Sequence, residues 1–137
     1  MPTLTRWYIK TALGWLVVAL GAGVGLQAGI ASIELRARLW PVYLHVITIG
    51  WLTGLVFGVA WWLFPRPGKD MSDRTPLGWT SYLLLNAGLL GRVVAEPLVG
   101  TARPGDWEAV VLALAALAQL GGVTMFAMVI WPRVRSR

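Results

Sequence analysis

The chain of 137 residues contains no cysteine, a single histidine and few charged residues. The absence of cysteine excludes a disulfide framework and a thiolate metal site within this chain. Charged residues make up 13% of the sequence, roughly half the share that is typical of a soluble domain. Hydrophobic residues make up 57%, and nine of them are tryptophan. This composition is typical of an integral membrane protein, and the lipid bilayer is therefore the first expected partner.

Four apolar segments are each long enough to cross a hydrocarbon core, which takes roughly 20 helical residues. They run over about 7–31, 41–64, 77–98 and 107–131, and the charged, Pro- and Gly-rich stretches between them are expected to be turns. Backbone groups in lipid must be paired internally, so these segments are expected to be helices. We predict an all-α integral membrane four-helix bundle that forms a single transmembrane domain over 1–137.

The distribution of basic residues predicts the orientation of this bundle. One side carries Arg6, Lys10, Arg66, Lys69, Arg74, Arg133, Arg135 and Arg137, and the other carries Arg36, Arg38 and Arg103 with Glu34, Asp106 and Glu108. Since basic residues collect on cytoplasmic loops, both termini are predicted to be cytoplasmic. The protein is then a multi-pass protein of the cell's inner (cytoplasmic) membrane. The net charge of +6 is a topology signal in this interpretation, and no nucleic-acid partner is expected.

His45 lies four residues after Pro41, which is expected in the first turn of the second helix. At about 1.5 Å per residue the histidine is roughly 6 Å inside the outer end of that helix. The third helix runs in the opposite direction and returns Arg92 and Glu96 to the same depth. Ionisable groups at membrane depth normally face the bundle interior or a cavity. His45, Arg92 and Glu96 are therefore a candidate site.

Two other interpretations of these residues remain open. Arg92 and Glu96 are four residues apart and could neutralise each other, while His45 could donate to a carbonyl or to Thr48. The three would then be a polar packing cluster in a cofactor-free accessory or assembly subunit of a respiratory complex. Alternatively, Glu96 could serve a proton or small-solute pathway that Arg92 gates.

Small residues at every fourth position predict where helices pack closely in lipid. The repeats comprise Gly21, Gly25 and Gly29 in the first segment and Gly50, Gly54 and Gly58 in the second. Five residues at about 100° each place Gly50 roughly 140° away from His45 around the helix. A flat apolar cofactor could then lie on the face that holds His45 and Thr48. Gln27, Asn86 and Gln119 are expected to be interhelical hydrogen-bond donors.

The second helix also carries a recognisable register. From His45 it reads "HVITIGWLTGLVFGVAWWLFP", which places Gly50, Trp51, Gly58 and Pro65 after the histidine. This register resembles the heme-ligating helices in the catalytic subunit I of heme-copper oxidases and nitric oxide reductases, above all the C-family type. The resemblance covers about one helix, and the whole chain is similar to small oxidase-like membrane proteins.

The resemblance implies a cofactor and roles for particular residues. In that superfamily a histidine near the outer face of such a helix is an axial ligand of heme, and arginines meet the heme propionates. It therefore implies heme b, with His45 as the iron ligand and Arg92 as a propionate partner. Thr48, from the same face, and Trp51, from the motif, complete the predicted cofactor-binding residues. The role implied is electron transfer or binding of a diatomic gas such as NO or O2, with a respiratory-chain electron donor as a possible partner.

The chain also departs from the superfamily. Some of its helices carry a His-x-His pair, but Tyr43 stands here at the first of these positions. The copper site needs three further histidines, so the chain alone is not expected to be a complete oxidase or reductase. A second histidine ligand for the iron would have to come from another copy of the chain. The resemblance to one four-helix arc of subunit I favours a homotrimer, and a shared bis-histidine heme favours a homodimer.

Overall fold

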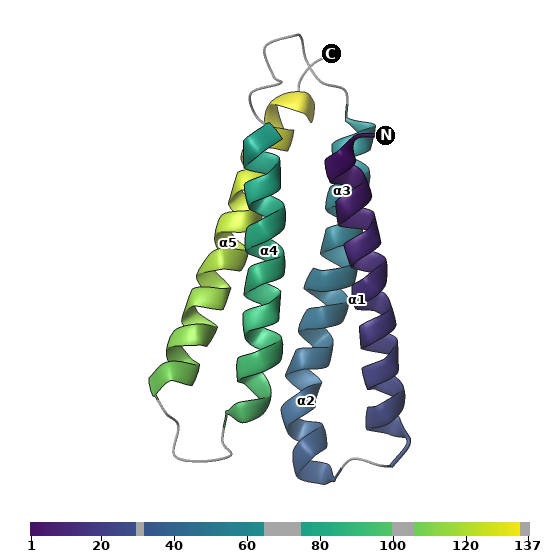
Figure 1. Cartoon of the computed structure of the whole chain (residues 1–137), viewed down its shortest axis with the longest axis vertical. Helices are drawn as coiled ribbons and strands as arrows, with labels where there is room; N and C mark the ends of the chain where they lie inside the picture. The colour runs from purple at the N-terminus through teal and green to yellow at the C-terminus, as the bar shows by residue number, and fades with distance from the viewer. Residues whose placement is uncertain (30–31, 65–74, 100–105, 135–137) are drawn as a thin grey trace.

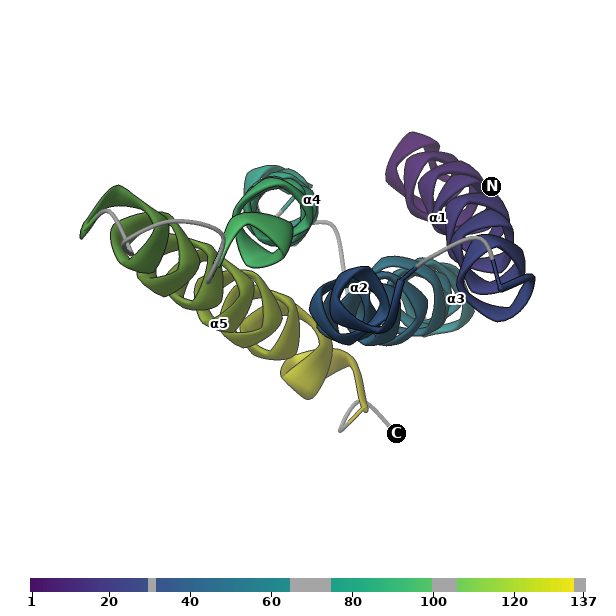
Figure 2. The same ribbon diagram turned by 90° about the horizontal axis from the view of Figure 1, so that it is seen from below.

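The structure is a computed structural model, and it describes residues 1–29, 32–64, 75–99 and 106–134. All regular elements in these ranges are helical, and they form four long antiparallel helices (Figure 1). The elements are α1 (Thr3–Gln27), α2 (Ile33–His45), η1 (Val46–Thr53), α3 (Gly54–Leu63), α4 (Thr75–Ala95), η3 (Glu96–Leu98) and α5 (Asp106–Val134). Seen end-on, α4 lies beside α5, and α1 lies beside the helix made of α2, η1 and α3 (Figure 2).

Three helices are long and apolar enough to cross a membrane. They are Thr3–Gln27, the continuous helix Ile33–Leu63, and Trp107–Val134. α4 does not meet the same criterion, because side chains such as Asn86 and Arg92 lower its hydropathy. The chain is therefore an all-α, multi-pass membrane protein with three candidate spans.

The second helix begins earlier than the sequence predicts. The stretch before Pro41 was expected to be a turn, but α2 already starts at Ile33. The side chain of Ser32 caps this end by accepting a hydrogen bond from the backbone N–H of Leu35 at 3.2 Å. Glu34 adds a negative charge in the first turn, where it interacts favourably with the helix dipole. Pro41 consequently lies inside the helix, and its predicted place in a first turn is wrong.

A π-helical segment, η1, follows His45 directly. The i→i+5 turns are wider than α turns, so each residue advances less than 100° around the axis. Threonine hydroxyls bond to carbonyl groups along this stretch: Thr48 donates to the carbonyl of Leu44 at 2.6 Å, and Thr53 donates to that of Thr48 at 2.9 Å. The offset of 140° predicted between His45 and Gly50 therefore does not apply here.

The glycine repeats behave differently in the two helices. A Cβ on Gly50, Gly54 or Gly58 would lie within 3.3 Å of α1 atoms, so the predicted close packing of the second helix is confirmed. A Cβ on Gly21, Gly25 or Gly29 would meet nothing within 4 Å. The predicted packing ridge of the first helix is wrong, because α1 uses the face of Ala12 and Trp15 instead.

A buried hydrogen-bonded chain links three helices. The hydroxyl of Tyr8 in α1 donates to Ser81 in α4 at 3.1 Å, and Ser81 donates to the carbonyl of Gly122 in α5 at 2.7 Å. Ser81→Ala removes both hydrogen bonds, the one from Tyr8 and the one to Gly122. Tyr8→Phe removes only the first and leaves the Ser81–Gly122 bond intact. We expect Ser81→Ala to lower the free energy of unfolding by about 2 kcal/mol and Tyr8→Phe to lower it by about 1 kcal/mol.

Denaturation of the purified protein in detergent measures this difference. Thr80→Ala is the matched control, because the exposed Thr80 hydroxyl bonds only to the carbonyl of Pro76 in its own helix. We expect the control to change the free energy of unfolding by less than about 0.5 kcal/mol. Equal losses of unfolding free energy in the Thr80 and Ser81 variants would contradict a stabilising role for the Tyr8–Ser81–Gly122 hydrogen bonds.

Candidate functional site

The structure brings His45, Arg92 and Glu96 together. His45 Nδ1 lies 3.2 Å from Oε2 and 3.1 Å from Oε1 of Glu96. Arg92 Nη1 donates to Glu96 Oε1 at 2.8 Å. The three side chains are partly buried, with exposed fractions of 30% for His45, 20% for Arg92 and 10% for Glu96. Glu96 is therefore the central residue, and it holds an imidazole on one side and a guanidinium on the other.

Local structure at the end of α4 explains this arrangement. α4 ends at Ala95, and Glu96 begins the 3-10 helix η3, which packs against α2. The four-residue spacing of Arg92 and Glu96 lets their side chains meet across one turn. Glu96 then reaches the neighbouring helix at the point where α2 gives way to η1, which is the position of His45.

Gln119 of α5 extends the cluster to a third helix. Its Oε1 accepts a hydrogen bond from Arg92 Nε at 3.0 Å, and the residue is only 7% exposed. Gln119 thus makes an interhelical hydrogen bond, but as the acceptor and not as the predicted donor, and the sequence did not identify Arg92 as its partner. Asn86 also bonds between helices by accepting from Trp15 Nε1 at 3.0 Å, whereas Gln27 is exposed.

The hydrogen-bond pattern determines the tautomer of His45. A carboxylate paired with a guanidinium only accepts hydrogen bonds, so we assign the proton to Nδ1, whose N–H then donates a hydrogen bond to Glu96. In a neutral imidazole the other ring nitrogen, Nε2, then has a free lone pair. Arg92 balances the charge of Glu96, and its two bonds use two of the five N–H donors of the guanidinium. The cluster presents an oriented imidazole beside a charge-neutral ion pair.

Three other predicted residues lie outside the cluster. Thr48 is exposed and bonds to the carbonyl of Leu44, so it is not the partner of His45. Trp51 is half-buried within η1. Tyr43 stacks on Trp40 with ring centroids 5.5 Å apart and packs against α1. Only His45, Arg92 and Glu96 of the predicted residues are in mutual contact.

The number of metal-ligating side chains limits which cofactors the cluster of His45, Arg92 and Glu96 could hold. Across the described ranges, no group of three or more His, Cys, Asp or Glu side chains is placed to hold a metal ion. A bare metal ion needs several protein ligands, whereas a porphyrin supplies four nitrogen ligands itself and needs only axial ones. Leu52 and Val56, further along the same helix, are exposed apolar side chains. One imidazole and one carboxylate are thus too few ligands for a bare metal ion, and a cofactor that brings its own ligands would need only the imidazole.

No family model, curated protein or solved structure matches the chain. The site is accordingly interpreted from its geometry.

Proposed function

We propose that this protein is an integral membrane protein that binds heme b through His45 and serves electron transfer or the binding of a diatomic gas. The observation that carries the proposal is the hydrogen bond from His45 Nδ1 to Glu96. Histidines that ligate metals almost always donate their other ring N–H to a carboxylate, a carbonyl or water. The bond to Glu96 supplies this second partner at a histidine within a candidate membrane span.

Each residue of the cluster has a separate task in this proposal. Glu96 fixes the tautomer and ring orientation of His45, so that Nε2 is the ligating atom. Arg92 neutralises the charge of Glu96 and offers its remaining N–H donors to a propionate. Gln119 holds Arg92 in place from α5. Bound heme supplies an iron centre that exchanges one electron or binds a small gas.

The proposal includes an orientation in the membrane. α1 begins and α5 ends at the same end of the bundle (Figure 1). Arg6 and Lys10 belong to that end of α1, and Arg133 belongs to that end of α5. Basic residues at one end support cytoplasmic termini in the inner membrane, with α4 as a fourth span. His45 and Glu96 then lie in the outer half of the bilayer.

The coordination number of the iron and the assembly of the protein are linked. With one histidine per chain, a bis-histidine heme requires His45 of a second copy and a twofold dimer. A homotrimer of four-helix subunits leaves each iron five-coordinate and open to NO or O2. The absence of histidines for a copper site argues against a complete oxidase or reductase in the isolated chain. We propose a respiratory-chain donor as the source of electrons.

An absorption spectrum of the protein purified from heme-replete cells tests the proposal. We expect a strong Soret band, and alpha bands that appear on reduction. Redox titration and gas addition to the same sample distinguish six-coordinate from five-coordinate iron. A colourless, well-folded protein would contradict heme binding and favour a cofactor-free accessory subunit. Proton flux in liposomes that is lost in Glu96→Gln would favour the pathway through Glu96 and Arg92.

The carboxylate of Glu96 is expected to lower the reduction potential of the heme. A charged acceptor makes the imidazole a more electron-rich ligand, which favours ferric iron. We expect Glu96→Gln to raise the midpoint potential by about 60 mV, which corresponds to a tenfold change for a one-electron couple. Glu34→Gln, at the exposed start of α2, is the matched control and should leave the potential unchanged. Equal potentials in the two variants would exclude an electronic role for Glu96.

A further inference from the structure

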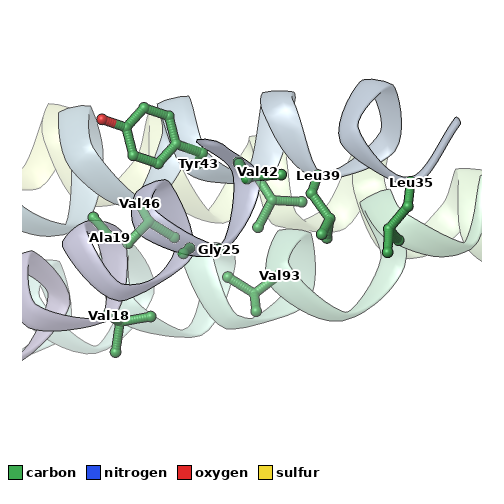
Figure 3. Close-up of a pocket in the computed structure, with 11 residues that line it drawn as sticks. Val18, Ala19, Gly25, Leu35, Leu39, Val42, Tyr43, Val46 and Val93 are labelled. Atoms are coloured by element: carbon green, nitrogen blue, oxygen red, sulfur yellow. The ribbon is translucent and has the colours of Figure 1, made fainter. Parts of the chain in front are cut away.

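A second feature of the molecule is an apolar groove between the last turns of α1 and the first turns of α2. It has a volume of about 420 Å³, and Val93 of α4 closes one side. The side chains that line it point into a common space (Figure 3). The lining includes Ala22 and Gly25 from α1, Leu39 from α2 and Val46 from the start of η1. His45 does not line the groove, because its side chain turns towards Glu96.

The length of the groove matches one leaflet of a bilayer. Its lining runs along the second helix from Leu35 in α2 to Val46 at the start of η1, a rise of about 16 Å at roughly 1.5 Å per residue. This is roughly half of a 30 Å hydrocarbon core. Leu35 lies near the start of α2, and Val46 is buried against Ala19 and Leu89. The groove therefore extends from the end of the bundle to about mid-membrane, which is the depth of one acyl chain.

A basic residue lies at the outer end of the groove. Arg36 is exposed and directly follows Leu35, which lines the groove. Glu34 is two residues earlier, about 160° away around the helix at 100° per residue. Glu34 and Arg36 therefore flank Leu35 at equal angles, but Arg38 follows within the same two turns of α2. Two cations against one carboxylate give this end of the groove a net positive charge, which is complementary to an anionic headgroup.

Tyr43 separates this groove from a second hollow on the same helices. The ring packs against Gly23, where an added Cβ would come within 3.3 Å of it. Beyond the ring lies a hollow of about 460 Å³, lined by Val24, Gln27 and other residues of α1. Two recesses that share Tyr43 as a dividing wall suit a ligand with two chains. Gln27, near the end of α1, supplies an amide at the level of the polar part of such a ligand.

We propose that the groove binds one acyl chain of a phospholipid with an anionic headgroup, whose phosphate meets Arg36 and whose second chain lies beyond Tyr43. The ligand belongs to the leaflet in which α1 ends and α2 begins. The binding is independent of heme, because none of the groove residues belongs to the His45 cluster.

Lipid titration of the delipidated, detergent-solubilised protein, followed by native mass spectrometry, tests this proposal. The probes are phosphatidylglycerol and phosphatidylcholine with identical acyl chains. We expect phosphatidylglycerol to saturate at one molecule per chain and to bind about fivefold more tightly than phosphatidylcholine, the effect of one cation near a headgroup. Arg36→Gln should remove this preference. Arg6→Gln, at the opposite end of α1, should preserve it.

Gly25→Leu tests the groove itself. The new side chain has open space, since a Cβ at Gly25 meets nothing within 4 Å, and it projects into the groove. We expect it to weaken binding of both lipids by about tenfold or more, because it occupies the volume of the acyl chain. Gly21→Leu, one turn earlier and outside the groove, is the matched control and should bind like the parent protein.

Several outcomes would overturn the proposal. Lipid uptake that does not saturate would show general adsorption, and equal affinities in the Gly25 and Gly21 variants would exclude the groove as the binding place. A phosphatidylglycerol preference that survives Arg36→Gln would place the headgroup elsewhere. Circular dichroism and gel filtration of each variant verify that it is folded, and Ala22→Phe repeats the test if Gly25→Leu is not.

Discussion

If the protein binds heme as proposed, His45→Ala is expected to yield a folded protein without Soret and alpha bands. His45 is the only imidazole in the chain, so its removal leaves the iron without a nitrogen ligand from the protein. The fold should survive, because the side chain is 30% exposed and its one described hydrogen bond goes to Glu96. Glu96 retains its ion pair with Arg92 at 2.8 Å. Heme content per protein and the thermal midpoint of the same preparation measure both expectations.

Imidazole added to the variant separates a ligand role from a structural one. Removal of the side chain leaves space beside Glu96 in which free imidazole can take the same bonds. We expect millimolar imidazole to restore a heme spectrum to His45→Ala, whereas Thr48→Ala should keep heme without any addition. An unchanged spectrum in His45→Ala would show that the chromophore is held elsewhere. Loss of heme from both variants would point to a general collapse of this face.

Gly88→Leu is expected to be the most destabilising of the substitutions considered, because a side chain there would collide with the backbone of α5. A Cβ at Gly88 would lie 2.7 Å from the carbonyl oxygen of Ala115 and 2.8 Å from Cγ of Gln119. Backbone atoms cannot move aside cheaply, so the two helices must separate. We expect the free energy of unfolding to fall by about 3 kcal/mol, as measured by denaturation in detergent.

The same substitution should also disturb the polar cluster. Gln119 packs directly on Gly88 and holds Arg92, so a leucine displaces the residue that anchors the guanidinium. Gly21→Leu is the control, since a Cβ there meets nothing within 4 Å. We expect the control to keep the heme spectrum and to gain up to about 1 kcal/mol from higher helix propensity. Similar losses in both variants would mean that leucine is harmful in any helix of this protein.

The sequence predicted the cluster from depth alone. Opposite chain directions placed His45 level with Arg92 and Glu96, and because ionisable groups at membrane depth normally face the bundle interior, the three residues were a candidate site. Gln119 was not predicted as a member, because a single amide in an apolar helix has no spacing rule that identifies its partner. Its position depends on how α4 and α5 cross, which is a property of tertiary packing.

The helix bounds and the glycine faces show a similar limit. The charged residues between Ile33 and Trp40 predicted a turn. The first turns of a capped helix tolerate such residues, however, and α2 begins at Ile33 and continues through Pro41. Equal glycine spacing in two helices predicted two packing ridges, yet only Gly50, Gly54 and Gly58 meet a neighbour. A repeat identifies a face that can pack, and the choice among such faces depends on the shapes of the other helices.

The π-helical segment after His45 also constrains how this protein can change over evolution. Its i→i+5 hydrogen-bonded turns enclose one more residue than α turns. The segment η1 therefore sets the angle around the helix axis between His45 and Gly54. Deletion of a single residue from Val46–Thr53 that restored α turns would leave His45 and α3 in nearly the same relative orientation, because a π segment fits one extra residue into the same rotation. The contact of His45 with Glu96 and the glycine contacts with α1 could then both be kept. A deletion between Gly54 and Gly58 would instead turn these glycines by about 100° relative to each other, so η1 should tolerate the loss of one residue better than α3 does.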